Sequence, residues 1–288
     1  MNESCAICGG ALGRELLVIT KPDRFERELG IADEGYRRAW VECMQCGTVT
    51  DILPPCVDRL AEIEQTYYAI DFKNSSLAEK FAKVMALPPG RSDNALRVAR
   101  VLDFIAQWPA LAGHTRSRRA LDIGAGLGIF PAAFLARAGA AWSMTVVEPD
   151  PLAAVHLRQL AQFPVIEEGL PLKQDIGRFH LITLNKVVEH LSDPVAMLRN
   201  VTPLLDSAAG VAYIEVPDKQ TIHYRPPEDN ILGALHRHLY GLRGLLRLVT
   251  QAGLVPLRLE RIFEPSGKLS VFAFVTTAAV AARLSAAD

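Results

Sequence analysis

Two pairs of cysteines near the start of the chain have the spacing of metal ligands. Cys5 and Cys8 form one pair, Cys43 and Cys46 form the other, and a glycine follows each pair. Cysteines three positions apart let one turn present two thiolates to a tetrahedral ion, and the glycine permits the backbone that turns N–H groups toward sulfur. The two pairs predict a closed structural zinc site with no open position for a substrate. The alternative is four unrelated buried cysteines.

The remaining sequence around these pairs fits a metal site better than disulfides. The 34 residues between the pairs exceed the usual ribbon spacing, so an insert must loop out. The first ten residues lack the basic start and apolar core of a secretion signal, which favours a reducing, cytoplasmic setting. Cys56 has no partner pair and is predicted to be a free thiol.

A glycine-rich loop is the second feature that could do chemistry. The segment 121–128 reads LDIGAGLG, with glycines at Gly124, Gly126 and Gly128 and the small Ala125 between the first two. Such a loop between a strand and a helix allows a tight turn and a close approach of backbone to a ligand. Several classes of nucleotide-binding protein share it.

Two details separate these classes. A dinucleotide fingerprint would place its third small residue at position 129, where this chain has Ile129. Asp122, two residues before the first glycine, would repel a diphosphate. S-adenosylmethionine has no phosphate and carries an ammonium group, which a carboxylate can approach directly or through water. The loop therefore favours S-adenosylmethionine.

Further cofactor contacts are predicted at the ends of the following strands. Glu148 ends the next strand, roughly twenty positions past the glycines, where a carboxylate accepts hydrogen bonds from ribose hydroxyls. Pro149 follows it directly. Glu168 ends the third strand and is expected to border the adenine, and Asn185 ends the fourth strand at the same carboxyl edge. A solvated acid at a strand end is the alternative for Glu148.

These residues must be positioned by alternating strands and helices. From residue 119 onward, short apolar strands alternate with amphipathic helices, which predicts a doubly wound α/β sheet. Strands are expected near 119–123, 143–148, 163–167, 179–185 and 211–216. Helices are expected near 129–138, 152–162, 195–205 and 241–252, and a helix capped by Asp93 or Asn94 precedes them. Two closing strands near 257–263 and 269–276 are expected to form a hairpin through 264–267.

Composition narrows the class of protein. The chain of 288 residues has a net charge of −1, so no global positive field is available to collect phosphates, and a nucleic-acid partner is not expected. No unbroken apolar stretch of about 18 residues exists, so no membrane span is expected. Half of the residues are apolar and 22% are charged, as in soluble globular proteins.

Taken together, three segments resemble class I S-adenosylmethionine-dependent methyltransferases. They are the loop at 122–128, the acidic strand end at 147–150 (VEPD) and the segment 185–194 (NKVVEHLSDP). The resemblance covers about residues 119 to 275. It implies a seven-stranded, Rossmann-like sheet with an antiparallel hairpin strand and S-adenosylmethionine at the carboxyl edge.

With the zinc-binding module added, the chain resembles a narrower group, the sugar C-methyltransferases and their relatives. Tyr67 and Tyr68 lie where that group has a tyrosine-rich linker, and His236 lies where it has a histidine before its last large helix. The group carries Tyr-x-Glu ahead of that histidine, whereas this chain has Gly-Ala-Leu at 233–235. That departure weighs against a keto-sugar nucleotide as the substrate.

The resemblance also points to residues for the methyl-transfer step. His190 follows the fourth strand at the ligand edge, and a histidine can remove a proton near neutral pH. His190, His236 and Tyr68 are the candidate catalytic residues, with the histidines as bases and the tyrosine lining the pocket. The alternative for His190 is a helix-start residue that packs on the sheet and shapes the pocket.

The sequence thus predicts three regions and leaves three functions open. Residues 1–58 would form the zinc module, 59–115 a helical linker or cap, and 116–288 the methyltransferase domain. The leading hypothesis is a methyltransferase for a small-molecule acceptor, a sugar or another secondary metabolite. The alternatives are an RNA or protein methyltransferase that holds its substrate with the zinc module, and a cofactor-binding scaffold without catalytic groups.

Overall fold

The computed structural model describes residues 4–53, 76–111 and 117–286. Its main element is a seven-stranded sheet with the order β10-β11-β8-β7-β4-β5-β6. The strands are β4 (Arg118–Ile123), β5 (Trp142–Val147), β6 (Val165–Ile166), β7 (Leu181–Asn185), β8 (Val211–Pro217), β10 (Leu254–Phe263) and β11 (Leu269–Thr277). Strands β4 to β8 pair in parallel, while β11 pairs antiparallel with both β8 and β10. The predicted fold class and the closing hairpin are confirmed.

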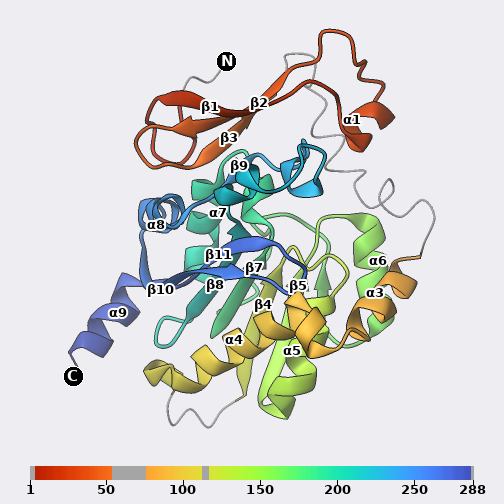
Figure 1. Cartoon of the computed structure of the whole chain (residues 1–288). Helices are drawn as coiled ribbons and strands as arrows, with labels where there is room; N and C mark the ends of the chain where they lie inside the picture. The colour runs from red at the N-terminus through yellow and green to blue at the C-terminus, as the bar shows by residue number, and fades with distance from the viewer. Residues whose placement is uncertain (1–3, 54–75, 112–116, 287–288) are drawn as a thin grey trace.

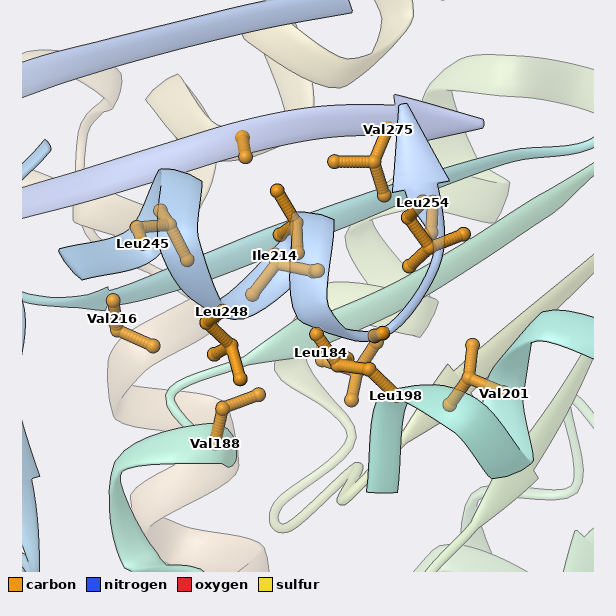
Figure 2. Packing of buried hydrophobic residues seen from close by; sticks show 14 of the residues in the cluster. Leu184, Val188, Leu198, Val201, Ile214, Val216, Leu245, Leu248, Leu254 and Val275 are labelled. Atoms are coloured by element: carbon orange, nitrogen blue, oxygen red, sulfur yellow. The ribbon is translucent and has the colours of Figure 1, made fainter. Parts of the chain in front are cut away.

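Helices cover both faces of this sheet (Figure 1). They are α3 (Leu77–Met85), α4 (Asp93–Gln107), α5 (Ile129–Ala138), α6 (Pro151–Leu160), α7 (Pro194–Val201), α8 (Leu242–Gln251) and α9 (Ala278–Ser285). Helices α4, α5 and α6 share one buried cluster with inward residues of the strands, including Tyr213 and Phe274. Helices α7 and α8 share the other, where Leu198 and Leu248 pack on Leu184 of β7 (Figure 2).

Two local predictions need adjustment. The third strand is shorter than predicted, because only Val165 and Ile166 pair with β5. The helix expected after the loop at 87–94 begins at Asp93, but its cap is Ser92, whose hydroxyl accepts a hydrogen bond from the Ala95 N–H. Neither Asp93 nor Asn94 is therefore the cap.

The N-terminal segment forms a second, four-stranded sheet with the order β1-β2-β3-β9. Its elements are β1 (Leu12–Ile19), α1 (Arg24–Glu28), β2 (Arg38–Cys43), β3 (Val49–Ile52) and β9 (His238–Leu239). The elements β1, α1 and β2 account for the long interval between the cysteine pairs. Strand β9 comes from far along the chain, so this sheet joins the N-terminal module to the part of the chain that forms the large sheet (Figure 1).

Side chains of the module strengthen that connection. The buried Arg38 guanidinium binds Asp51 at 2.5 Å and donates to the Leu232 carbonyl at 2.9 Å. The Asp23 carboxylate caps α1 and accepts a hydrogen bond from the Ala234 N–H at 2.7 Å. The segment 230–240 is consequently held against the module along its length.

Candidate active site

The glycine loop follows β4 and leads into α5, as predicted. Gly124, Gly126 and Gly128 all have positive φ, between 56° and 75°. A Cβ on Gly128 would lie 2.7 Å from Leu157 Cδ2, so the residue is needed for packing as well as for the turn. A Cβ on Gly124 would lie 2.6 Å from Val187 Cγ2. The loop shape therefore depends on glycine at these positions.

Glu148, just after β5, holds the glycine loop in place. Its carboxylate accepts hydrogen bonds from the Gly126 N–H at 2.7 Å and from the Asp150 N–H at 3.0 Å. Burial raises the pKa of this carboxyl, while the two backbone N–H groups oppose that shift. Glu148 also lines the cleft described below, as a ribose-binding residue would.

Asp122, a predicted cofactor residue, is buried and hydrogen-bonded to its neighbours. It is 2% exposed, and its Oδ1 accepts hydrogen bonds from Thr183 Oγ1 at 2.5 Å and Asn185 Nδ2 at 3.0 Å. Burial raises its pKa to about 7. Asn185 lines the cleft described below, whereas Asp122 does not. Asp122 can therefore act on a ligand only through its charge or through its hydrogen bond to Asn185.

A cleft of about 1580 Å³ opens at the carboxyl edge of the large sheet. Six of the predicted cofactor residues line it: Gly124, Ala125, Gly126, Glu148, Pro149 and Asn185. Gly128 supports the loop from behind, against Leu157 and Leu160. Glu168 lines a separate hollow with Glu167 and Lys173, while its neighbours Gly169 and Leu170 line the cleft.

The structure brings His190 and His236 together in this cleft. Their ring centroids are 4.6 Å apart, although 45 residues of chain separate them. The Nδ1 atom of His190 lies 2.8 Å from the Leu235 carbonyl, and the Nδ1 atom of His236 lies 2.7 Å from the Ile231 carbonyl. Burial and the neighbouring His190 lower the pKa of His236 to about 3. His238 points elsewhere, toward Thr50 of β3.

Several residues of the cleft had no signal in the sequence. Arg24 and Phe25 reach it from α1, Arg225 from the segment after β8, and Lys268 from the closing hairpin. Glu189 also lines it and is completely buried, which raises the pKa of its carboxyl to about 8. Glu189 was visible only as part of the Glu-His pair in segment 185–194. Tyr67 and Tyr68, predicted to line the pocket, lie outside the described residues, as does Cys56.

The four cysteines of the predicted zinc site form one cluster. The Sγ atoms of Cys5 and Cys46 are 3.7 Å apart, those of Cys8 and Cys43 are 3.5 Å apart, and all four lie within 4.8 Å of one another. A tetrahedral zinc ion with bonds of about 2.3 Å would place its sulfur ligands roughly 3.8 Å apart. The cysteine geometry therefore fits such an ion.

The glycines that follow the two cysteine pairs have the same conformation. Gly9 and Gly47 both have a φ of 71°. Their N–H groups donate to the carbonyls of Cys5 and Cys43, at 2.8 and 2.9 Å. The two turns therefore share one geometry, as their common spacing predicts.

Comparisons with known proteins agree with this architecture. A family model described as "Methyltransferase domain" matches residues 91–259, more than half of the chain. Among curated proteins, the ubiquinone biosynthesis O-methyltransferase of Xanthomonas campestris pv. campestris is 30% identical over 122 residues. That match covers 41% of this chain and 48% of the relative, so the chain spans about half the length of the curated relatives it matches.

Two solved structures share the fold at low sequence identity. The 1,6-didemethyltoxoflavin-N1-methyltransferase of Burkholderia thailandensis has a TM-score of 0.51 and 17% identity, and covers 86% of this chain and 98% of its own. The magnesium protoporphyrin IX methyltransferase of Synechocystis PCC 6803 has a TM-score of 0.50 and 14% identity, and the match covers 76% of this chain and 97% of that protein.

None of the helices in residues 4–53, 76–111 and 117–286 combines the length and the apolar character that a membrane span needs.

Proposed function

Because the chain belongs to the methyltransferase-domain family, whose class I members use S-adenosylmethionine, we propose that it methylates a hydroxyl group of a small molecule. The acceptor would be a sugar or another secondary metabolite. The observation that carries this proposal is the pairing of His190 with His236 beside the glycine loop, in one cleft. The O-methyltransferase activity named for the curated relatives supports the same acceptor atom.

The tautomers of the two histidines suit them to a hydroxyl. Each Nδ1 faces a backbone carbonyl, which accepts a hydrogen bond and cannot donate one, so the proton belongs on Nδ1. Nε2 is then the basic nitrogen of each ring. A lone pair in the cleft can take a hydroxyl proton, and we propose that His190 or His236 handles it there, with Tyr68 lining the pocket.

The remaining cleft residues would hold the cofactor. S-adenosylmethionine supplies an activated methyl group, so the protein has mainly to position the reactants. Glu148 would bind the ribose while it braces the glycine loop through Gly126. Asn185 would face the amino acid end, backed by the Asp122 carboxylate. Glu168 does not line the cleft, so the contact with the adenine edge would come from the backbone of its neighbours Gly169 and Leu170, which do.

We propose further that Cys5, Cys8, Cys43 and Cys46 bind one zinc ion with a structural role. The site is closed by four thiolates and separate from the residues that line the cleft. Its effect on the active site would pass through β3 and β9, because this pairing holds the segment that carries His236. The proposal keeps the predicted division of the chain into a zinc module at 1–58, a helical linker or cap at 59–115 and a methyltransferase domain at 116–288.

The test is methyl transfer from labelled S-adenosylmethionine to a panel of small hydroxyl, amine and carbon acceptors. We expect label on oxygen, and we expect His190→Ala or His236→Ala to lower turnover by about 100- to 10,000-fold while cofactor binding persists. His223→Ala is the control, since this exposed histidine does not line the cleft. Near-normal turnover in both single variants and the double variant would exclude the histidines, and label on carbon would exclude the acceptor class.

A further inference from the structure

Glu189 is a buried carboxylate with unmet bonding capacity. It lies in the turn Val188–His190 after β7 and has no exposed surface. Neither Oε1 nor Oε2 has a hydrogen-bond partner among the described residues. A buried carboxylate normally has partners, so an unsatisfied one points to a group that the described side chains do not supply.

The two histidines stand beside this carboxylate with the support that metal ligands usually have. One ligand atom from each of Glu189, His190 and His236 lies within 4.8 Å of the others. Histidines that bind metals commonly donate their other ring N–H to a carbonyl, which fixes the tautomer and the ring orientation. Both histidines place Nδ1 against a carbonyl, at 2.8 and 2.7 Å.

The backbone also holds these three side chains in one place. The Arg237 N–H donates to the Glu189 carbonyl at 2.8 Å, which ties the two segments that carry the three side chains. Lys186 also lines the cleft and forms ion pairs with Glu215 at 3.3 Å and Glu264 at 3.2 Å, carboxylates that it shares with Arg97 and Arg100. One carboxylate and two neutral imidazoles would leave a divalent ion with a net positive charge.

We propose that Glu189, His190 and His236 bind one divalent first-row transition-metal ion in the cleft. Two imidazoles favour zinc, iron, cobalt or nickel over magnesium, which prefers oxygen ligands. Three protein ligands leave positions open for a substrate, in contrast to the closed four-cysteine site.

This site would select an acceptor that chelates, which deepens the proposed function and rests on it. A vicinal diol or an ortho-diphenol offers two oxygens to the open positions. Coordination lowers the pKa of a hydroxyl, so its proton is released to solvent. The oxygen then bonds to the methyl carbon, the carbon–sulfur bond breaks, and its electron pair stays on the sulfur, which becomes a neutral thioether. With the ion bound, the histidines would hold the ion and the ion would promote loss of the proton, in place of direct proton transfer to a histidine.

The test uses Co²⁺ as the probe on protein whose four-cysteine site holds zinc. After mild chelation, elemental analysis should find one zinc per chain, and added Co²⁺ should bind as one further equivalent without sulfur-to-cobalt absorption. Loss of a residue that supports a metal ligand typically lowers metal affinity about 10- to 100-fold. Glu189→Gln and His236→Asn remove ligands themselves, so each should weaken Co²⁺ binding by at least that factor. His223→Ala should bind Co²⁺ like the unchanged protein. Binding of S-adenosylhomocysteine by every variant shows that it is folded.

Three outcomes would overturn the metal site. They are no Co²⁺ beyond the zinc equivalent, unchanged Co²⁺ affinity in both ligand variants, and full turnover after chelation. The last outcome would leave the proposed methyl transfer to a hydroxyl standing. Conversely, one equivalent of Co²⁺ bound through Glu189 and His236, with no hydroxyl acceptor methylated, would support the metal site and remove the proposed function.

Discussion

Glu148 has two tasks that a single substitution can expose. Its carboxylate binds the N–H groups of Gly126 and Asp150, and it is the predicted partner of the ribose hydroxyls. We expect Glu148→Ala to weaken binding of S-adenosylhomocysteine by about 1–3 kcal/mol, because charge-assisted hydrogen bonds are lost. Calorimetry measures this directly. Glu260→Ala, on the exposed edge of β10, is the control, and equal affinities in the two variants would contradict the assignment.

Asp122 predicts a dependence of stability on pH. Burial raises its pKa from 3.8 to about 7, so between these values the folded state holds a proton that the unfolded state has lost. The free energy of unfolding therefore falls as the pH rises through this window, by about 1.4 kcal/mol per pH unit at most. Asp122→Asn removes this pH-dependent loss of stability. The melting temperature of the variant should therefore exceed that of the unchanged protein by more at pH 8 than at pH 5. An advantage independent of pH would show that Asp122 is ionised in the folded protein throughout.

At the level of elements, α5 has a glycine at each end. Gly128 precedes the helix and Gly139 ends it, with φ of 75° and 73°. A Cβ would meet Leu157 and Leu160 at Gly128 but nothing within 4 Å at Gly139. Gly128→Ala should lose about 1–2 kcal/mol through its left-handed backbone and roughly 1–3 kcal/mol more through overpacking. Gly139→Ala, at φ 73° and ψ −171°, should lose about 1–3 kcal/mol through the backbone alone. Urea denaturation measures both losses, and a smaller loss at Gly128 than at Gly139 would contradict the packing argument.

The same elements show which parts of the fold were predictable. The glycine loop, the acidic end of β5 and the closing hairpin are set by neighbours in sequence, and the structure has each of them as expected. The predicted third strand is too long because apolar Phe163 extends the apolar run, whereas only Val165 and Ile166 pair with β5. The cap at Ser92 was missed because Asp93 and Asn94 are equally good capping residues by type.

Over the whole molecule, the cleft combines residues that no local pattern connects. Arg24 and Phe25 enter it only because Asp23 and Arg38 fasten the N-terminal module to residues 232–234. The two-residue strand β9 is too short for a sequence pattern, yet it pairs the module with the segment carrying His236. Glu189 was not singled out because its burial and its lack of partners appear only in the folded chain.

This arrangement gives the four-cysteine cluster a testable influence at a distance. We expect protein purified without added metal to hold one zinc, and Cys8→Ser or Cys43→Ser to lose it and unfold the module at lower temperature. Turnover should fall as well, since β3 would no longer hold β9. Cys56→Ser, at the predicted free thiol, should keep the zinc. Well-folded protein without metal, or a cysteine variant with unchanged melting, would contradict this account.

The central claim is that the cleft at the carboxyl edge of the large sheet is built for S-adenosylmethionine. Its most direct test is a calorimetric titration of the purified protein with S-adenosylhomocysteine and, separately, with NAD. The loop geometry at Gly124 and Gly126, with Asp122 beneath it, predicts micromolar affinity for S-adenosylhomocysteine, on the order of −8 kcal/mol, and weaker binding of NAD. Tighter binding of NAD than of S-adenosylhomocysteine would contradict the account.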